Sequence, residues 1–337
     1  MLHVVILLAC AVAIYLSCEW FVNAVEWLGL RLKIGRLAVG TVLAAFGTAL
    51  PESVVTFVAV VLGSGPDQKD IGVGAAMGGP LALATAAYGV TGFMLLTRRR
   101  KVPAGAPASG GGDDVGDTHK LARDQKWFLV IFVVKVALGL VTFAYKPWLG
   151  LLFFAAYGVY FWRELRADSS DDEEVEIEPL RLQPRRATPA TWAVTTQVVV
   201  TLVIIFVASQ LFVRQLEAVG PMLGLPAAVT ALLLAPIATE LPEIMNAIIW
   251  VRQGKTHLAL ANISGAMMIQ ATVPSGLGIL FTRWRFDGPL LLSGIVTIIA
   301  MIFLLLALNS GRFSGKTLTW AAAFYGLFAV CLIPILA

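Results

Sequence analysis

Two short stretches combine a threonine, a proline and a glutamate, and each lies within a long apolar segment. Residues 47–52 read Gly-Thr-Ala-Leu-Pro-Glu, and residues 238–243 read Ala-Thr-Glu-Leu-Pro-Glu. A carboxylate inside a membrane costs several kcal/mol unless a partner compensates it, so a glutamate in such a segment is a candidate functional residue. A structural kink is the alternative for one copy, but the recurrence of Leu-Pro-Glu favours a functional site.

The prolines make oxygen ligands available beside these glutamates. Pro51 has no N–H to donate to the carbonyl of Gly47, and Pro242 has none for Ala238, so each break frees a backbone oxygen next to a threonine and a glutamate. Carboxylates, hydroxyls and carbonyls are the ligands that Ca²⁺ prefers, and Na⁺ also uses them. Crowded carboxylates repel one another, so at least one should hold a proton unless a cation is bound. Such a site is suited to exchanging one cation, or a proton, for another.

The composition is that of an integral membrane protein. Of the 337 residues, 58% are hydrophobic and only 14% are charged, whereas soluble domains have about 25% charged residues. The net charge of +4 follows from the loops and implies no nucleic-acid partner. The three cysteines have no metal-ligand spacing. The sequence contains no ATP-binding loop, zinc-protease motif or nucleophile elbow, so we expect no enzyme and no cofactor beyond transported cations.

Ten segments are apolar and long enough to cross a bilayer as helices, which takes roughly 20 residues each. They lie near residues 2–28, 36–62, 71–96, 127–144, 148–163, 192–218, 225–251, 258–282, 288–307 and 317–336. The loops on one side carry 19 Lys and Arg residues and those on the other side carry 4. Because cytoplasmic loops are enriched in Lys and Arg, we predict a multi-pass protein of the cell (inner) membrane with both termini outside.

The sequence repeats itself at an offset of 191 residues. Residues 20–52 align with residues 211–243 without a gap, and 11 of the 33 pairs are identical. Five segments per copy is an odd number, so the second copy enters the membrane from the opposite face, as in many secondary transporters. We therefore predict two inverted five-helix repeats whose broken helices, with Glu52 and Glu243, meet near the middle of the membrane.

The repeats define the predicted organisation of the chain. Residues 1–163 form the first five-helix repeat, residues 164–191 a polar cytoplasmic linker, and residues 192–337 the second five-helix repeat. The linker contains an acidic run at residues 168–178, which we interpret as solvated, although a regulatory cation or partner site stays open.

Isolated charged residues have simpler interpretations. We interpret Glu19 and Glu26 as structural, since Glu26 and its repeat mate Glu217 lie near segment ends, where a solvated carboxylate costs little. Lys135 and Arg214 have stems long enough to reach a membrane interface, and a gating or pairing role for them stays open. His257 is expected to be solvated in a loop.

The two Leu-Pro-Glu stretches resemble the Gly-Thr-Ser-Leu-Pro-Glu motif of the cation/calcium antiporter superfamily, and specifically its prokaryotic sodium/calcium exchanger-like proteins. The resemblance covers most of the chain in segment number and repeat plan. It implies that Glu52, Thr48, Glu243 and Thr239 bind cations. Here Ala49 and Glu240 replace the serine of the motif in the two copies.

A second family motif, Gly-Asn-x-x-Gly-Ser-Asn followed by Asn or Asp, is poorly matched. The first copy, at residues 74–80, lacks its side-chain donors, with Gly79 and Leu83 at two ligand positions. The second copy, at residues 261–267, keeps Asn262, and Gln270 stands at the Asn/Asp position. The resemblance thus implies Asn262 and Gln270 as further cation ligands.

These residues predict a secondary active antiporter that exchanges Ca²⁺, or another hard divalent cation, for Na⁺ or H⁺ by alternating access. Glu52, Glu243 and Glu240 are the expected metal ligands. The loss of neutral ligands and the gain of Glu240 favour H⁺ over several Na⁺ ions as the counter-ion, but both stay open. The alternative is a passive cation channel or a non-transporting scaffold. The partners are the lipid bilayer and inorganic cations, and no protein partner can be inferred.

Overall fold

The computed structural model describes residues 2–35, 38–62, 66–99, 118–166, 177–222, 224 and 233–336. The regular structure of these residues is helical, without strands, which confirms the predicted all-α class. The acidic run at 168–178 falls almost entirely outside the described residues, as does the start of the predicted segment at 225–251.

Helices occur at all ten predicted segments. In the first half they are α1 (Leu2–Leu32), η1 (Val39–Ala44), α3 (Ala45–Phe57), η2 (Val58–Leu62), α4 (Pro66–Ala82), η3 (Leu83–Ala87), α5 (Tyr88–Arg99), α6 (Thr118–Leu140), η4 (Lys146–Leu149) and α7 (Gly150–Arg166). In the second half they are α8 (Thr191–Met222), α10 (Ala235–Thr239), α11 (Leu241–Gln253), α12 (Thr256–Phe281), α13 (Gly288–Asn309) and α14 (Gly315–Leu336).

Not all of these helices are long and apolar enough to cross a membrane alone. Six of the described helices are, and a seventh span results if the bent pair Val39–Ala49 and Glu52–Leu62 counts as one. Helix α7 has 17 residues and α11 has 13, fewer than the roughly 20 that a straight span needs. The ten-span arrangement therefore stays a prediction, whereas the membrane character of the fold is plain.

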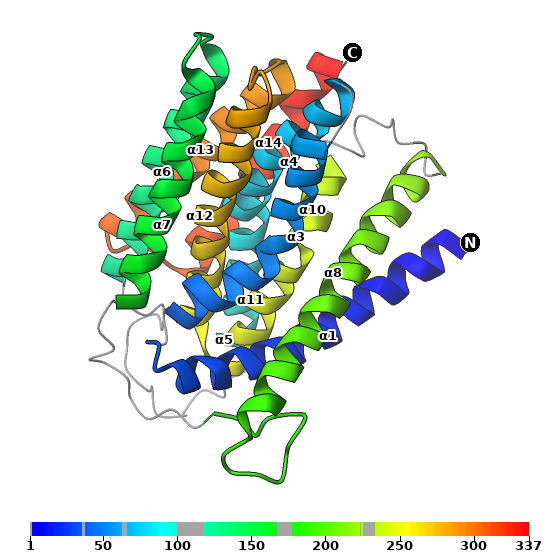
Figure 1. Cartoon of the computed structure of the whole chain (residues 1–337), viewed down its shortest axis with the longest axis vertical. Helices are drawn as coiled ribbons and strands as arrows, with labels where there is room; N and C mark the ends of the chain where they lie inside the picture. The colour runs from blue at the N-terminus through cyan, green and yellow to red at the C-terminus, as the bar shows by residue number, and fades with distance from the viewer. Residues whose placement is uncertain are drawn as a thin grey trace.

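Helix α12 forms the centre of the molecule. It is buried along most of its length and packs against η1, α3, α4, α6, α7 and α11. Helices α1 and α8 pack along each other and extend away from this bundle on one side (Figure 1). The central helix thus belongs to the second half of the sequence but is surrounded mainly by helices of the first.

Two glycines that the sequence repeat aligns, Gly78 and Gly265, bring the halves into close contact. A Cβ at Gly265 would lie 2.2 Å from the carbonyl oxygen of Thr41 in η1. A Cβ at Gly78 would lie 2.8 Å from the Pro236 ring in α10. Each half therefore supplies a glycine against which the broken helix of the other half rests, as expected for repeats related by a two-fold axis.

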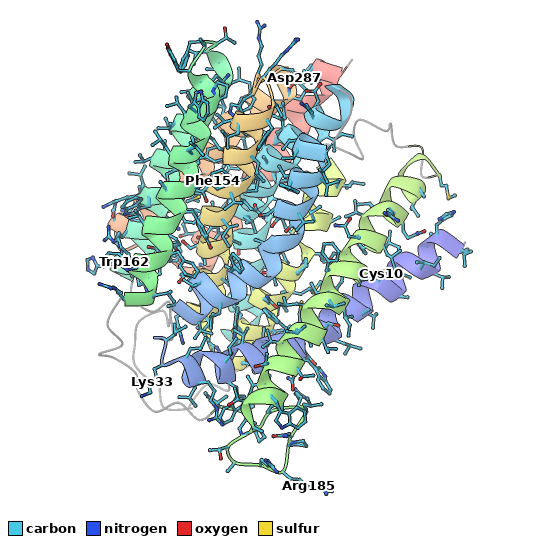
Figure 2. All side chains as sticks on the ribbon, in the orientation of Figure 1. Cys10, Lys33, Phe154, Trp162, Arg185 and Asp287 are labelled. Carbon is cyan, nitrogen blue, oxygen red and sulfur yellow. The ribbon has the colours of Figure 1, made fainter. Side chains whose placement is uncertain are left out.

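Two of the basic loops lie at one end of the molecule, and a loop from the other predicted side lies at the opposite end. Lys33 and Arg185, from two of the basic loops, lie at the lower end of the molecule in Figure 2, and Asp287 lies at the opposite end. The basic loops thus share a side at these positions. That this side is the cytoplasmic one remains a prediction.

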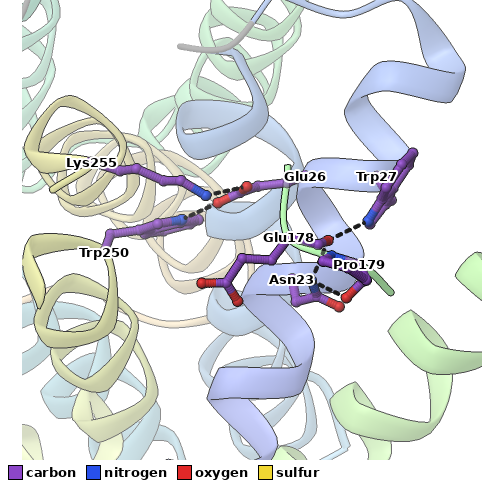
Figure 3. A network of polar contacts seen from close by, with 7 residues as sticks. All are labelled: Asn23, Glu26, Trp27, Glu178, Pro179, Trp250 and Lys255. Carbon is purple, nitrogen blue, oxygen red and sulfur yellow. Dashed lines mark hydrogen bonds and ion pairs between the residues drawn. The ribbon is translucent and has the colours of Figure 1, made fainter. Parts of the chain in front are cut away.

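The described part of the linker is bound to α1 (Figure 3). Asn23 donates to the carbonyls of Glu178 and Pro179, both at 3.2 Å, and Trp27 donates to Glu178 at 2.9 Å. The side chain of Gln197 on α8 donates to Asn23 and accepts from the backbone of Leu182. The chain between the two halves is therefore attached to the first helix of each.

Glu26 has the structural role that we expected, but it is not solvated. It is 9% exposed, its Oε2 lies 2.5 Å from Nζ of Lys255, and Trp250 donates to its Oε1 at 2.9 Å (Figure 3). The ion pair compensates the burial of the carboxylate and fixes α1 to the turn between α11 and α12.

Two other expectations were wrong. Lys135 does not reach an interface, because its side chain is fully buried inside the bundle. His257 does not lie in a loop, because α12 already begins at Thr256. Arg214 is exposed on α8, as a side chain that reaches an interface should be.

An ion-pair cluster surrounds Glu164 near the end of α7. Nζ of Lys120 lies 2.9 Å from its carboxylate, Arg123 donates to it at 3.0 Å, and the Thr41 hydroxyl donates to it at 3.2 Å. Asp124 is buried beside these groups, 3.7 Å from Nε of Arg123. Because Thr41 belongs to η1, the cluster connects the first broken helix to α6 and α7.

Asp124 should make stability depend on pH. It precedes the apolar part of α6, and burial, followed by the Glu164 charge, raises the pKa of its carboxyl from 3.8 to about 7. The folded chain keeps this proton to a higher pH than the unfolded chain, so the stabilisation is present at low pH and lost as pH rises through 7. Raising the pH from about 5 to 8 should lower the free energy of unfolding by at most about 3 kcal/mol, because the loss of about 1.4 kcal/mol per pH unit ends near the folded-state pKa of about 7.

Thermal unfolding followed by tryptophan fluorescence in detergent measures this dependence. Asp124→Asn should flatten it, whereas Asp70→Asn, at an exposed position of α4, should keep the slope of the wild type. Equal slopes in the two variants would contradict the assignment.

Candidate cation site

The first Leu-Pro-Glu stretch lies at a bend between two helical pieces. The pieces that meet between Ala49 and Glu52 are inclined by 48°, and π-helical turns flank α3 on both sides. π-helical turns occur often at functional sites. Thr48 is fully buried here and donates to the carbonyl of Ala44 at 3.1 Å. Glu52 is partly buried, and its Oε2 atom is inaccessible and has no hydrogen-bond partner.

The second stretch is broken at Glu240 itself. Helix α10 ends at Thr239 and α11 begins at Leu241, so Glu240 forms the junction between them. Glu243 follows in the first turn of α11, where the positive end of the helix dipole favours a negative charge. Glu240 and Glu243 are both fully buried. The predicted broken helix is thus confirmed in the second half.

The structure brings the two stretches together. Glu52 lies close enough to Glu240 and Glu243 to interact with their charges, and these two also interact with each other. Thr48 of the first half lies beside Glu243 of the second, and Thr239 lies beside Glu240. Residues distant in sequence therefore form one buried acidic cluster, consisting of Glu52, Glu240 and Glu243.

Gln270 of α12 holds the extra acid Glu240 in place. Its side-chain nitrogen donates to both carboxylate oxygens of Glu240 at 2.8 Å. A Cβ at Gly79 of α4 would lie 2.5 Å from Oε1 of Gln270 and 2.7 Å from Oε1 of Glu240. A side chain at position 79 would therefore displace the ends of Gln270 and Glu240, and the missing donor at Gly79 makes the space that the acid and the amide occupy.

The cluster is asymmetric about the predicted two-fold axis. The repeat pairs Glu240 with Ala49 and Gln270 with Leu83, and both apolar residues are fully buried. The second half thus supplies an acid and an amide where the first half supplies apolar surface.

Several buried polar atoms in and near the cluster have no hydrogen-bond partner. They are Oε2 of Glu52, both carboxylate oxygens of Glu243, Oε1 of Gln270, and both side-chain polar atoms of Asn246 and Asn262. Buried polar groups in folded proteins are nearly always paired, so unpaired ones point to a missing ion or water. These atoms provide the carboxylate and amide oxygens that a hard cation requires.

Of these two asparagines, the sequence predicted only Asn262 as a ligand. Asn262 lies eight residues from Gln270, about 12 Å along α12. Its backbone approaches Gly40 of η1. Asn246 was missed. It lies three residues after Glu243 and so on the same face of α11, a spacing that a search for polar residues one turn from each glutamate would have found.

The carboxylates alone do not make a metal site in this conformation. In the part of the chain that the structure describes, no three His, Cys, Asp or Glu residues are arranged to hold a metal ion. The oxygen atoms gathered here come from carboxylates, threonine hydroxyls and side-chain amides together.

Comparisons with known proteins agree with this architecture. A family model described as "Sodium/calcium exchanger protein" matches residues 2–165 and 194–336. The "Inner membrane protein YrbG" of Escherichia coli (strain K12) is 25% identical over 332 residues, which are 92% of this chain and 93% of that protein.

Solved structures of the sodium-calcium exchanger NCX_Mj have the same fold. One, soaked with 2.5 mM Na⁺ and 10 mM Sr²⁺, gives a TM-score of 0.73 at 18% identity, and another, soaked with 10 mM Na⁺ and zero Ca²⁺, gives 0.74 at 17%. Each match covers 98% of both chains. Since the family model matches nearly the whole sequence, this chain belongs to the sodium/calcium exchanger family of membrane transport proteins.

Proposed function

We propose that this protein is a secondary active antiporter that exchanges Ca²⁺, or another hard divalent cation, for Na⁺ or H⁺ by alternating access. The observation that carries the proposal is the buried cluster of Glu52, Glu240 and Glu243, which draws on both halves of the sequence and leaves carboxylate oxygens unpaired. The family and the fold support cation exchange as the general activity.

In this proposal each ligand has a distinct part. Glu52 and Glu243 bind the divalent cation from opposite halves, with Thr48 and Thr239 supplying hydroxyl oxygens. Glu240, held by Gln270, adds the charge that a proton or a second cation neutralises. Asn262, two helical turns from Gln270, contributes an amide oxygen on the path to this cluster.

The charge of the cluster explains why transport is an exchange. Carboxylates crowded inside a bilayer are unfavourable without compensating positive charge. When the divalent cation leaves, protons or Na⁺ ions must replace it, and their departure restores the site for the next divalent cation. Outward and inward transport are therefore coupled through the same carboxylates.

The burial of the cluster favours an antiporter over a passive channel. Glu240 and Glu243 have no solvent-exposed surface in this conformation, so an ion bound between them needs a conformational change to leave. Alternating access between inverted repeats supplies such a change. We further propose that the protein lies in the cell (inner) membrane with its basic loops in the cytoplasm and both termini outside.

Replacing either Leu-Pro-Glu glutamate should strongly reduce transport. In inside-out vesicles whose interior is loaded with Na⁺ or acidified, the wild type should take up ⁴⁵Ca²⁺ against its gradient. Glu52→Gln and Glu243→Gln should each reduce this uptake by a factor on the order of 10 to 100, since a hydrogen bond or contact with a charged group contributes about 1.5–3 kcal/mol. Asp70→Asn, exposed on α4, is the control and should transport normally. Wild-type uptake by both glutamine variants would place the site elsewhere.

A side chain at Gly79 should also impair transport. Gly79→Ala places a Cβ within 2.7 Å of Gln270 and Glu240, so both groups must shift, and we expect at least about a tenfold loss of ⁴⁵Ca²⁺ uptake, equivalent to roughly 1.4 kcal/mol. Gly74→Ala is the matched control, because Gly74 lies on the same helix with nothing within 4 Å of its Cβ position. If the two variants transport equally at equal expression, the proposed arrangement at Glu240 is not the transporting one.

A further inference from the structure

Helix α4 contains a break that the cation cluster does not use. Pro80 lies inside α4 and has no N–H, so the carbonyl of Ala76, four residues earlier, lacks its helical donor. Nζ of Lys135, on α6, donates to this carbonyl oxygen at 2.8 Å. The ammonium group of one helix thus fills the broken turn of another.

Lys135 contacts one carbonyl oxygen and one aromatic ring, two groups that attract cations. Its side chain is fully buried, and its Nζ lies 4.5 Å from the centre of the Phe132 ring. Among the described residues it forms no ion pair. A carbonyl oxygen and an aromatic face both attract small cations. The carbonyl of Met77, the next residue of α4, accepts a hydrogen bond from the hydroxyl of Ser293 on α13 at 3.2 Å. Side chains of two other helices thus donate to this turn of α4.

This break adjoins the cation cluster. Gly79, which abuts Glu240 and Gln270, directly precedes Pro80. The sequence repeat pairs Pro80 with Met267 of α12, which has a backbone N–H, so the second half has no break at this position. The proline of α12, Pro274, lies further along the helix, and the Gln270 carbonyl that it leaves without a helical donor accepts from the hydroxyl of Ser275 at 3.3 Å. A charged side chain inside a membrane is costly and as a rule serves a function.

We propose that the Lys135 ammonium is a cation supplied by the protein itself. It occupies the broken turn at Ala76 that would otherwise accept a monovalent cation, so this half of the protein holds one exchangeable ion fewer. The inference that Lys135 changes the ion stoichiometry rests on the antiport function proposed above. The inference that Lys135 occupies a cation site does not depend on that function.

The test is binding of ²²Na⁺ to purified protein in detergent, with choline chloride keeping the ionic strength constant. Lys135→Met keeps an unbranched apolar stem but removes the charge and leaves the Ala76 carbonyl unpaired. We expect this variant to bind an additional Na⁺ ion per chain, with saturation, compared with the wild type.

The matched control restores the missing helical donor. In the double variant Pro80→Ala, Lys135→Met, the N–H of residue 80 can bond the Ala76 carbonyl, so the additional Na⁺ should no longer bind. The proposal is overturned if Lys135→Met binds no more Na⁺ than the wild type, or if the double variant retains the gain.

A second measurement covers the case in which Lys135→Met does not fold. Lys135→Ala leaves space for a small organic cation, so methylammonium chloride should raise its thermal unfolding temperature, and leave that of the wild type unchanged. Stabilisation of both proteins, or of neither, would also overturn the proposal. Gradient-driven ⁴⁵Ca²⁺ uptake by the wild type tests the antiport function separately, so either proposal can fail while the other stands.

Discussion

Inside a bilayer no water is available to pair with a backbone carbonyl or a carboxylate, so each such group must find a partner within the chain. The arrangement of the broken helices depends on this constraint. At Ala76 the partner is a lysine of another helix, and at Glu240 it is the amide of Gln270. At Glu243 no hydrogen-bond partner is present among the described residues, and this is where we propose that the exchangeable ion binds.

The same constraint explains why glycines lie where the broken helices approach their neighbours. Polar groups of two broken helices can share partners only if their backbones approach closely, and a side chain would keep them apart. Because Gly265 has no side chain, η1 packs directly against the backbone of α12. Because Gly79 has none, the Glu240–Gln270 pair packs directly against the backbone of α4. The glycines of α4 and α12 therefore allow both the close packing of these helices and the polar contacts of the candidate cation site.

The sequence predicts the helices and the pairing of the motifs better than the detail of the site. Hydropathy locates the segments because lipid requires apolar side chains, and the repeat predicts that Glu52 and Glu243 lie near each other. The sequence does not show that Gln270 binds Glu240, because that contact depends on how α12 is rotated against α10. Lys135 was mispredicted for a related reason: its distance from the interface depends on packing, which local composition does not encode.

The attachments of α1 restrict how the molecule can move. At one end of this helix, Glu26 is paired with Lys255 and Trp250, while the N-terminal end extends away from the bundle (Figure 1). Asn23 is joined through the linker and Gln197 to the start of α8. Helices α1 and α8 are therefore joined to each other and, through Glu26, to the turn between α11 and α12, immediately beyond the helix that carries Glu243. The first helix of each half is thus connected to the chain next to the candidate cation site.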